Sequence, residues 1–204
     1  SQPVEGNYTM DQLAGDVKGA LDVLGIWKVH YIGLSIGGMI GQGFALAYPE
    51  RLQSLTLCDT HPSSPDDSAG LWDQRKAAVR KGGVKALADG NMERWFTPEF
   101  KEANPARWKE IHSTICGTSD AGFLGCAAAI QNFDYLDRLP TIKIPTLVIC
   151  GDDDPATPPD RNKLLASKIP GARYEDIAKA RHLPNVERPE PFNRLMLSFL
   201  GLNR

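Results

Sequence analysis

Apolar residues recur along the chain in two patterns: short continuous runs and longer stretches with helical spacing. The short runs are rich in Val, Ile, Leu and Thr and predict four strands, at 28–34, 54–60, 146–151 and 172–177. The stretches between them place apolar residues three or four positions apart, which predicts helices. Near-continuous apolar strands that alternate with helices are typical of a parallel sheet covered on both faces. The predicted fold class is therefore α/β.

Helix-end signals support three of these helices. Thr9 precedes the periodic stretch 10–24 as an N-cap, and Gly25 follows it. Residues 35–48 follow the first strand with helical character up to Pro49, and Pro189 suits the first turn of a last helix that runs to Leu200. The first strand, a sharp turn and a helix therefore follow one another directly.

The pattern changes between the second and third strands. No strand signal occurs from Pro62 to about Pro140, and helical stretches take its place, among them 69–90 and 104–115. We expect a helical cap at 65–137, inserted into a core formed by 1–64 and 138–204.

Composition narrows the class of protein. The 204 residues carry a formal charge of −2 and 42% hydrophobic residues, as expected of one globular domain. This charge gives no reason to expect nucleic acid or an anionic membrane as a partner, and no apolar run is long enough to cross a bilayer. A small molecule is the expected partner.

The cysteines predict a cytosolic protein. They are far apart, form no CxxC pair and show no metal-ligand spacing: Cys58, Cys116, Cys126 and Cys150. We expect reduced thiols, mostly buried, and no metal site.

The stretch "YIGLSIGGMIGQ" (31–42) places Ser35 at the turn between a strand and a helix. A serine nucleophile at such an elbow has a strained backbone, which small residues at Gly33, Gly37 and Gly38 would permit. The N–H of Ile36, at the helix N-terminus, would then face a developing oxyanion. The alternative is a glycine-rich turn with a solvated serine.

A serine nucleophile needs a base oriented by an acid, in the chain order serine, acid, histidine for this elbow. Asp154 follows the third strand and is the expected acid; Asp59, at the end of the second strand, is its rival. Asp152 and Asp153 are expected to be solvated turn or capping residues.

His182 is the expected base, because it lies in the loop between the fourth strand and the last helix. His61, in the loop after the second strand, is the rival. His30 and His112 are expected to be surface or packing residues.

Six stretches together resemble the α/β-hydrolases, and within them the 3-oxoadipate enol-lactonases: "YTMDQLAGDV", "GLSIGGMIGQ", "PERLQSLTLCDT", "RWFTPEF", "LPTIKIPTLVICGDDDPATPP" and "HLPNVERPE". The likeness spans nearly the whole chain. By position, it implies that Ser35 is the nucleophile, Asp154 the acid and His182 the base. It also implies hydrolysis of 3-oxoadipate enol-lactone, a step of aromatic-compound breakdown in the β-ketoadipate pathway, with no metal or organic cofactor.

The chain departs from that family pattern in two ways. Arg181 precedes the histidine where relatives commonly have a small residue. The resemblance also implies about four further strands and a helix before residue 1, so the N-terminal part of the sheet is expected to be missing from this chain. That missing segment, or a complementary chain, would supply the second oxyanion N–H.

Substrate contacts are less specific. A run of five cations could bind a substrate carboxylate or form a solvated helix face: Arg75, Lys76, Arg80, Lys81 and Lys85. Of the aromatic residues Trp72, Trp95 and Phe96, Trp95 is the candidate for lining a pocket. The open alternatives are a carboxylesterase, an acyl-homoserine-lactone hydrolase, a cofactor-free perhydrolase, and a non-catalytic fragment or binding protein of the same fold.

Overall fold

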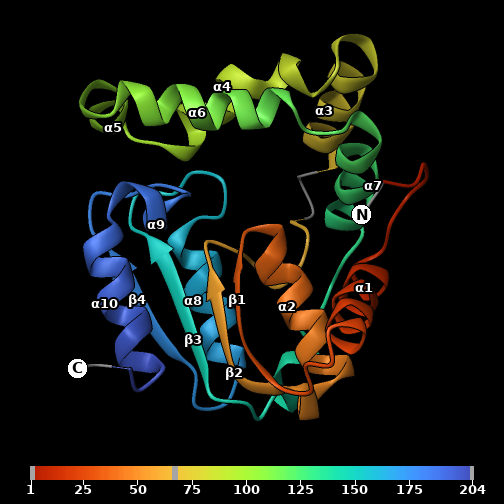
Figure 1. Ribbon diagram of the computed structural model, residues 1–204, viewed down its shortest axis with the longest axis vertical. Coiled ribbons are helices and arrows are strands. Elements are labelled where there is room, and N and C mark those ends of the chain that lie inside the picture. Colours follow the sequence, from red (N-terminus) through yellow and green to blue (C-terminus); the bar gives the residue numbers. More distant parts are fainter. Residues whose placement is uncertain (1–2, 66–68, 203–204) are drawn as a thin grey trace.

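One parallel sheet of four strands organises the chain (Figure 1). The computed structural model describes residues 3–65 and 69–202. The strands lie side by side in chain order: β1 (Val29–Leu34), β2 (Leu52–Cys58), β3 (Thr146–Gly151) and β4 (Arg173–Ile177). The four expected strands are all present, and the α/β prediction is confirmed.

Helices pack against both faces of this sheet. On one face, α2 (Ile36–Ala47) and α8 (Pro159–Lys168) enclose a core that includes Leu55, Leu57 and Val148. On the other face, α10 (Pro189–Phe199) packs against a second cluster whose strand residues include Cys58, Leu147 and Ile149. Successive residues of a strand point to opposite faces, so two covered faces require the continuous apolar runs seen in the sequence.

The first helix, α1 (Met10–Val23), begins where its capping signal predicts. The Thr9 side chain accepts the Gln12 N–H, and the Gln12 side chain accepts the Thr9 N–H, which together form a capping box. Gly25, with φ of 68°, follows the helix end. Buried Met10 and Ala14 hold α1 in the same core as α2.

Among the described residues, five α-helices lie between β2 and β3: α3 (Ala69–Gly82), α4 (Ala88–Trp95), α5 (Pro98–Ala103), α6 (Pro105–Cys116) and α7 (Asp120–Gln131). Figure 1 shows α4, α5 and α6 as a layer beyond the end of the sheet toward which the arrows of β2 and β3 point. A separate apolar cluster, with Val79, Met92 and Phe96 at its centre, holds these helices together. The boundaries 65 and 137 of the cap stay a prediction, and residues 66–68 beside the first of them lie outside the described part.

Short helices complete the chain: the 3₁₀ turns η1 (Pro49–Arg51), η2 (Val84–Leu87) and η3 (Leu139–Thr141), and the helix α9 (Pro184–Glu187). Within residues 3–65 and 69–202, no helix combines the length and apolar character that crossing a membrane requires. The four thiols are free, but only Cys58 and Cys150 are buried; Cys116 is exposed, which differs from the expected burial. The cytosolic location stays a prediction.

Strand β1 forms one edge of the sheet. It pairs with β2 on one side and has no strand on the other among the described residues. The Ile32 side chain is accordingly half exposed. The expected strands before residue 1 concern chain outside this sequence and stay a prediction.

Candidate active site

Ser35 lies at the junction of β1 and α2 in a strained backbone conformation. Its φ of 54° and ψ of −120° fall outside the regions that non-glycine residues ordinarily occupy. The Ser35 N–H donates to the Cys58 carbonyl at 2.9 Å, and the Ser35 carbonyl accepts the Gly38 N–H at 2.9 Å. The last bond of the β1–β2 ladder and the first turn of α2 thus hold this conformation from both sides.

Close approach explains two of the three glycines around Ser35. A Cβ at Gly33 would lie 2.2 Å from the Gly37 carbonyl oxygen, and one at Gly38 would lie 2.8 Å from the Thr60 side chain. A Cβ at Gly37 would meet nothing within 4 Å, so the expectation that the elbow needs a small residue there is wrong. The turn requires glycine only at Gly33 and Gly38.

Ile36 is the first residue of α2. The first N–H groups of a helix have no acceptor within the helix and carry a partial positive charge. The Ile36 N–H is therefore of the kind that stabilises an oxyanion beside Ser35.

Asp154 and His182 form a buried acid–base pair. His182 Nδ1 lies 2.8 Å from Asp154 Oδ2, and both residues are buried. The same carboxylate accepts the Thr157 hydroxyl at 2.5 Å and the Ala156 N–H at 2.7 Å. Burial acts to raise the pKa of Asp154, but His182 and the other donors outweigh it, so the pKa of Asp154 is lowered below its ordinary value. Asp154 is therefore ionised at neutral pH.

The bond at Nδ1 determines which nitrogen of His182 is free to act as a base. A carboxylate can only accept, so the proton belongs on Nδ1 and the lone pair on Nε2. Trp95 contributes to the same surroundings, since its ring centroid lies 6.0 Å from that of His182 at an interplanar angle of 35°.

The loop after β2 connects Ser35 with this pair. The Thr60 hydroxyl donates to the Ser35 carbonyl at 2.9 Å. One carboxylate oxygen each of Asp59 and Asp154 and one ring nitrogen of His182 all lie within 4.8 Å of one another. The register pairs Leu34 with Cys58, and Cys58 with Ile149, so the carboxyl ends of β1, β2 and β3 lie next to one another. Ser35 and the acid–base pair lie at these carboxyl ends of the strands.

The competing acids of the same loop are used differently. Asp152 is exposed and accepts the Lys179 N–H at 2.7 Å, as expected of a capping residue. Asp153 is also exposed, but its carboxylate accepts the Arg181 guanidinium at 2.9 Å. Neither contacts His182 in the described structure.

The other histidines have other partners. His30 lies in β1, 2.7 Å from the Ser54 hydroxyl, and His112 lies 3.0 Å from Asp89 in the cap. His61 is buried and stacks on Phe133 with ring centroids 5.7 Å apart. Burial, then the nearby Arg161 charge, lowers the pKa of His61 to about 4, and its Nδ1 has no hydrogen-bond partner in the part of the chain that the structure describes. His61 therefore lacks the oriented acid that His182 has.

Two side chains attach the cap to the His182 loop. Arg181 donates from its guanidinium to the Glu93 carbonyl at 2.8 Å, in addition to its bond with Asp153. Buried Glu187 accepts the Arg181 N–H at 2.6 Å and both the N–H and the hydroxyl of Thr97 at 2.7 Å. The departure at Arg181 thus has a structural use, which is to hold the end of α4 beside His182.

The five cations of the cap differ in burial. Arg75 is partly buried, donates to the Asn91 side chain at 2.8 Å and lies over the Trp72 ring. Burial, with the charge of Arg94, lowers the pKa of Arg75 to about 10. Lys76 pairs with Asp73 at 2.9 Å, and the other three are exposed: Arg80, Lys81 and Lys85. Of the aromatic candidates, Phe96 is fully buried in the cap core.

Among the described residues, one group of side chains has the composition of a metal site: Asp59, Asp154 and His182. The separation of 2.8 Å between Asp154 and His182 is that of a hydrogen bond, and Thr157 and Ala156 occupy further acceptor positions of the carboxylate. These bonds account for the set without an ion.

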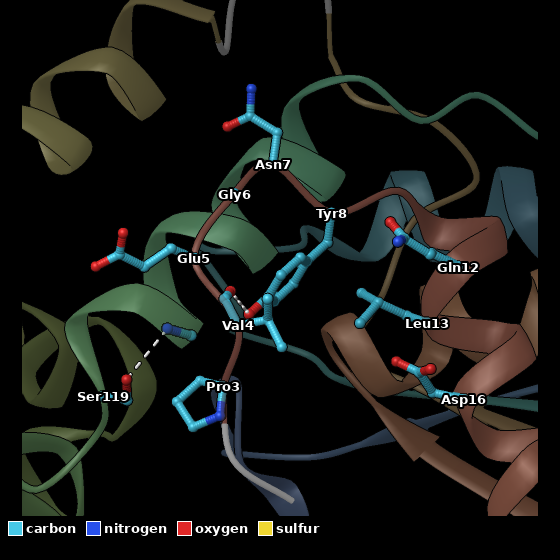
Figure 2. A pocket seen from close by; sticks show the side chains of 11 residues that line it. Pro3, Val4, Glu5, Gly6, Asn7, Tyr8, Gln12, Leu13, Asp16 and Ser119 are labelled. Atoms are coloured by element: carbon cyan, nitrogen blue, oxygen red, sulfur yellow. Dashed lines mark hydrogen bonds between the residues drawn. The ribbon is translucent and has the colours of Figure 1, made fainter.

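A surface pocket of about 520 Å³ lies elsewhere (Figure 2). It is lined by the N-terminal segment from Pro3 to Tyr8, by Gln12, Leu13 and Asp16 of α1, and by Ser119 and Gly122 at the start of α7. Neither Ser35 nor the acid–base pair lines this pocket, so the pocket is separate from the candidate active site.

Thr157 and Glu187 were not predicted from the sequence. Thr157 follows Asp154 by three residues, a spacing at which a hydroxyl reaches an earlier side chain in a turn. Glu187 gives no comparable signal, because its three donors come from the cap and from the loop before His182.

The chain matches a family model described as alpha/beta hydrolase fold over residues 1–189. It is 35% identical over 193 residues to 3-oxoadipate enol-lactonase 2 of Acinetobacter baylyi. This alignment covers 95% of this chain and 71% of that protein. The enol-lactonase from Burkholderia xenovorans LB400 superposes with a TM-score of 0.93 at 35% identity, covering 97% of this chain and 75% of that one. A thermophilic esterase from Thermogutta terrifontis gives 0.91 at 30% identity, covering 98% and 74%. The chain therefore belongs to the α/β-hydrolase family, in which it is similar to 3-oxoadipate enol-lactonases.

Proposed function

We propose that this hydrolase opens a carboxylic ester or lactone through an acyl-enzyme on Ser35. The observation that carries the proposal is the strained Ser35 backbone at the carboxyl end of β1, on the same side of the sheet as the buried Asp154–His182 pair. A strained residue persists only where its surroundings impose it, and such residues concentrate at functional sites. A solvated serine in a permissive turn would need no such constraint.

In the first step Ser35 Oγ attacks the carbonyl carbon while its proton passes to His182 Nε2. The carbonyl electrons move to the oxygen, where the Ile36 N–H stabilises the negative charge. The C–O bond of the lactone then breaks, and the leaving oxygen takes the proton from His182. Asp154 fixes the imidazole orientation and stabilises its cation throughout.

In the second step water attacks the acyl carbon while His182 takes a proton from the water. The bond between the acyl carbon and Ser35 Oγ then breaks, and His182 returns the proton to Oγ. The product is the free acid. Asp154, His182 and Ser35 supply the acid, base and nucleophile, so these steps use no cofactor.

Within this class we propose 3-oxoadipate enol-lactone as the substrate. The support is similarity at 35% identity to proteins named enol-lactonases in two organisms. Trp95, which lies against His182, is the proposed wall of the substrate site. The place in aromatic-compound breakdown belongs to the same proposal.

Steady-state hydrolysis tests the proposal against its alternatives. The panel comprises the enol-lactone, an aryl ester, an acyl-homoserine lactone and a peroxide-dependent assay. We expect the enol-lactone to give the largest kcat/KM and Ser35→Ala to lose at least about 10³-fold in kcat. A larger kcat/KM for the aryl ester or the acyl-homoserine lactone would identify that compound class as the substrate instead of the enol-lactone. Turnover that needs peroxide would identify a perhydrolase. Unchanged turnover in Ser35→Ala would contradict the mechanism.

A further inference from the structure

Asp59 is a buried carboxyl group that the proposed mechanism does not use. It directly follows β2 and is fully buried, with a backbone φ of 44°. Its Oδ1 accepts the Gly151 N–H at 2.8 Å, whereas its Oδ2 is buried without a hydrogen-bond partner among the described residues. An unpaired buried carboxyl oxygen costs free energy, so its retention calls for a reason.

The carboxyl group of Asp59 lies next to the acid–base pair. A carboxylate oxygen of Asp59 is within 4.8 Å both of an Asp154 oxygen and of a His182 ring nitrogen. Two carboxylates this close in a buried site do not both ionise readily. Burial, and then the Asp154 charge, raise the pKa of Asp59 well above its ordinary value, while the pKa of Asp154 is lowered. The negative charge therefore resides on Asp154.

The neighbouring thiols of Cys58 and Cys150 do not alter this assignment. Burial raises the pKa of the Cys58 and Cys150 thiols, so both are neutral. A neutral Asp59 beside an ionised Asp154 is the stable arrangement, and Asp154 keeps the hydrogen bond from His182.

We propose that Asp59 is a second acid of this site, a positioning residue that accepts the hydrogen bond from His182 Nδ1 when Asp154 has no carboxylate. The effect of Asp59 on catalysis rests on the proposed function, whereas its hydrogen bond to His182 does not. The Asp154 charge is the second cause, after burial, of the raised pKa of Asp59, so its removal lowers that pKa and favours an ionised Asp59 next to the imidazole. Its free Oδ2 then turns toward Nδ1, while Oδ1 stays anchored on Gly151.

A double-mutant cycle tests this assignment through kcat for ester hydrolysis. We expect Asp154→Asn to retain a kcat at least about 10-fold above that of Asp59→Asn/Asp154→Asn, and Asp59→Asn to cost more in the variant background than in the wild type. Asp152→Asn/Asp154→Asn is the matched control, since Asp152 is an exposed acid of the same loop, and it should equal Asp154→Asn. If removing Asp59 changes the kcat of Asp154→Asn by less than about twofold, Asp59 is not a second acid.

A second readout needs no turnover. The low-field proton NMR resonance of the hydrogen-bonded Nδ1–H, assigned by its loss in His182→Ala, should persist in Asp154→Asn and vanish in the double variant. Absence from both variants would overturn the inference even if the chain hydrolyses no ester. Conversely, a persistent resonance together with unchanged turnover in Ser35→Ala would refute the proposed function alone.

The variants that carry asparagine at position 59 should fold. Asparagine tolerates the φ of 44° at position 59 and keeps an oxygen for the Gly151 N–H. If circular dichroism shows the double variant to be unfolded, Asp59→Gly, which also tolerates this φ, takes its place in the cycle.

Discussion

Nδ1 of His182 lies 2.8 Å from Oδ2 of Asp154, and the two side chains are almost entirely withdrawn from solvent. The Thr157 hydroxyl joins them, 2.5 Å from the same Oδ2 and 3.3 Å from Nδ1. Because Asp154 is ionised and can only accept, it fixes both the orientation and the tautomer of the imidazole. In the proposed mechanism, this geometry depends on further residues besides Asp154 and His182.

Thr157 should support catalysis by holding the Asp154 carboxylate. Thr157→Val keeps the shape of the side chain and removes its hydroxyl, so we expect about a 10-fold loss of kcat, or ~1.4 kcal/mol, with little change in KM. Thr157→Ser should restore most of the activity. A loss of stability without a change in kcat, or no rescue by serine, would show that the hydroxyl is only structural.

Trp95 should affect substrate binding more than chemistry. Its ring lies against His182 but donates nothing to it. We expect Trp95→Ala to raise KM about 3- to 10-fold, and Trp95→Phe to stay near the wild-type value, because a ring contact contributes roughly 0.5–1.5 kcal/mol. Trp108→Phe, in the cap core, is the control and should leave KM unchanged. If Trp95→Ala keeps the wild-type KM for the enol-lactone, Trp95 does not line the substrate site.

Glu187 should couple the cap to the His182 loop. Its carboxylate accepts three donors, two from Thr97 and one from Arg181. In Glu187→Gln an amide group replaces one acceptor oxygen, so we expect the free energy of unfolding to fall by about 1–3 kcal/mol in urea denaturation. Exposed Glu190→Gln is the matched control and should stay within about 0.5 kcal/mol of the wild type. Equal stability of both variants would contradict the structural role of Glu187.

His61 should make the fold sensitive to acid. Its pKa of about 4 in the folded chain is lowered from 6.5 by burial and by Arg161. Below pH 6.5 the unfolded chain binds a proton that the folded chain does not, so stability is lost as pH falls from 6.5 toward about 4, by at most ~1.4 kcal/mol per pH unit.

The matching variant is His61→Phe, which keeps a ring against Phe133 and cannot titrate. Urea unfolding at pH 7 and pH 4.5 should show that His61→Phe loses less stability than the wild type, by about 1–3 kcal/mol. Parallel losses in the wild type and His61→Phe would show that His61 titrates normally.

Much of the core fold could be predicted from local pattern. A parallel strand buried on both faces is a continuous apolar run, and Thr9 and Gly25 delimit α1 with chemistry that acts within a few residues. The turn at Ser35 was predictable for the same reason, because the strain and the close approach at Gly33 arise within five residues. The prediction that position 37 needs glycine was wrong. The space around this position depends on the folded surroundings, which the local sequence does not reveal.

The contacts around the acid–base pair were less predictable. Asp59 meets Asp154 across almost a hundred residues of sequence, and Glu187 meets Thr97 across the cap. No periodicity encodes such pairs, because they depend on how the cap and the sheet edge are placed. The rival position of Asp59 was visible from the strand end, but its unpaired oxygen was not.

Ser35 as the nucleophile is tested most directly by active-site labelling with a serine-directed phosphonate, followed by intact-mass measurement and peptide mapping. We predict one adduct per chain, located on Ser35, with no adduct in Ser35→Ala and strongly slowed labelling in His182→Ala. Ser113→Ala, which removes an exposed cap serine, should label as the wild type does. Absence of an adduct on Ser35, or an unchanged adduct in Ser35→Ala, would contradict the assignment of Ser35 as the nucleophile.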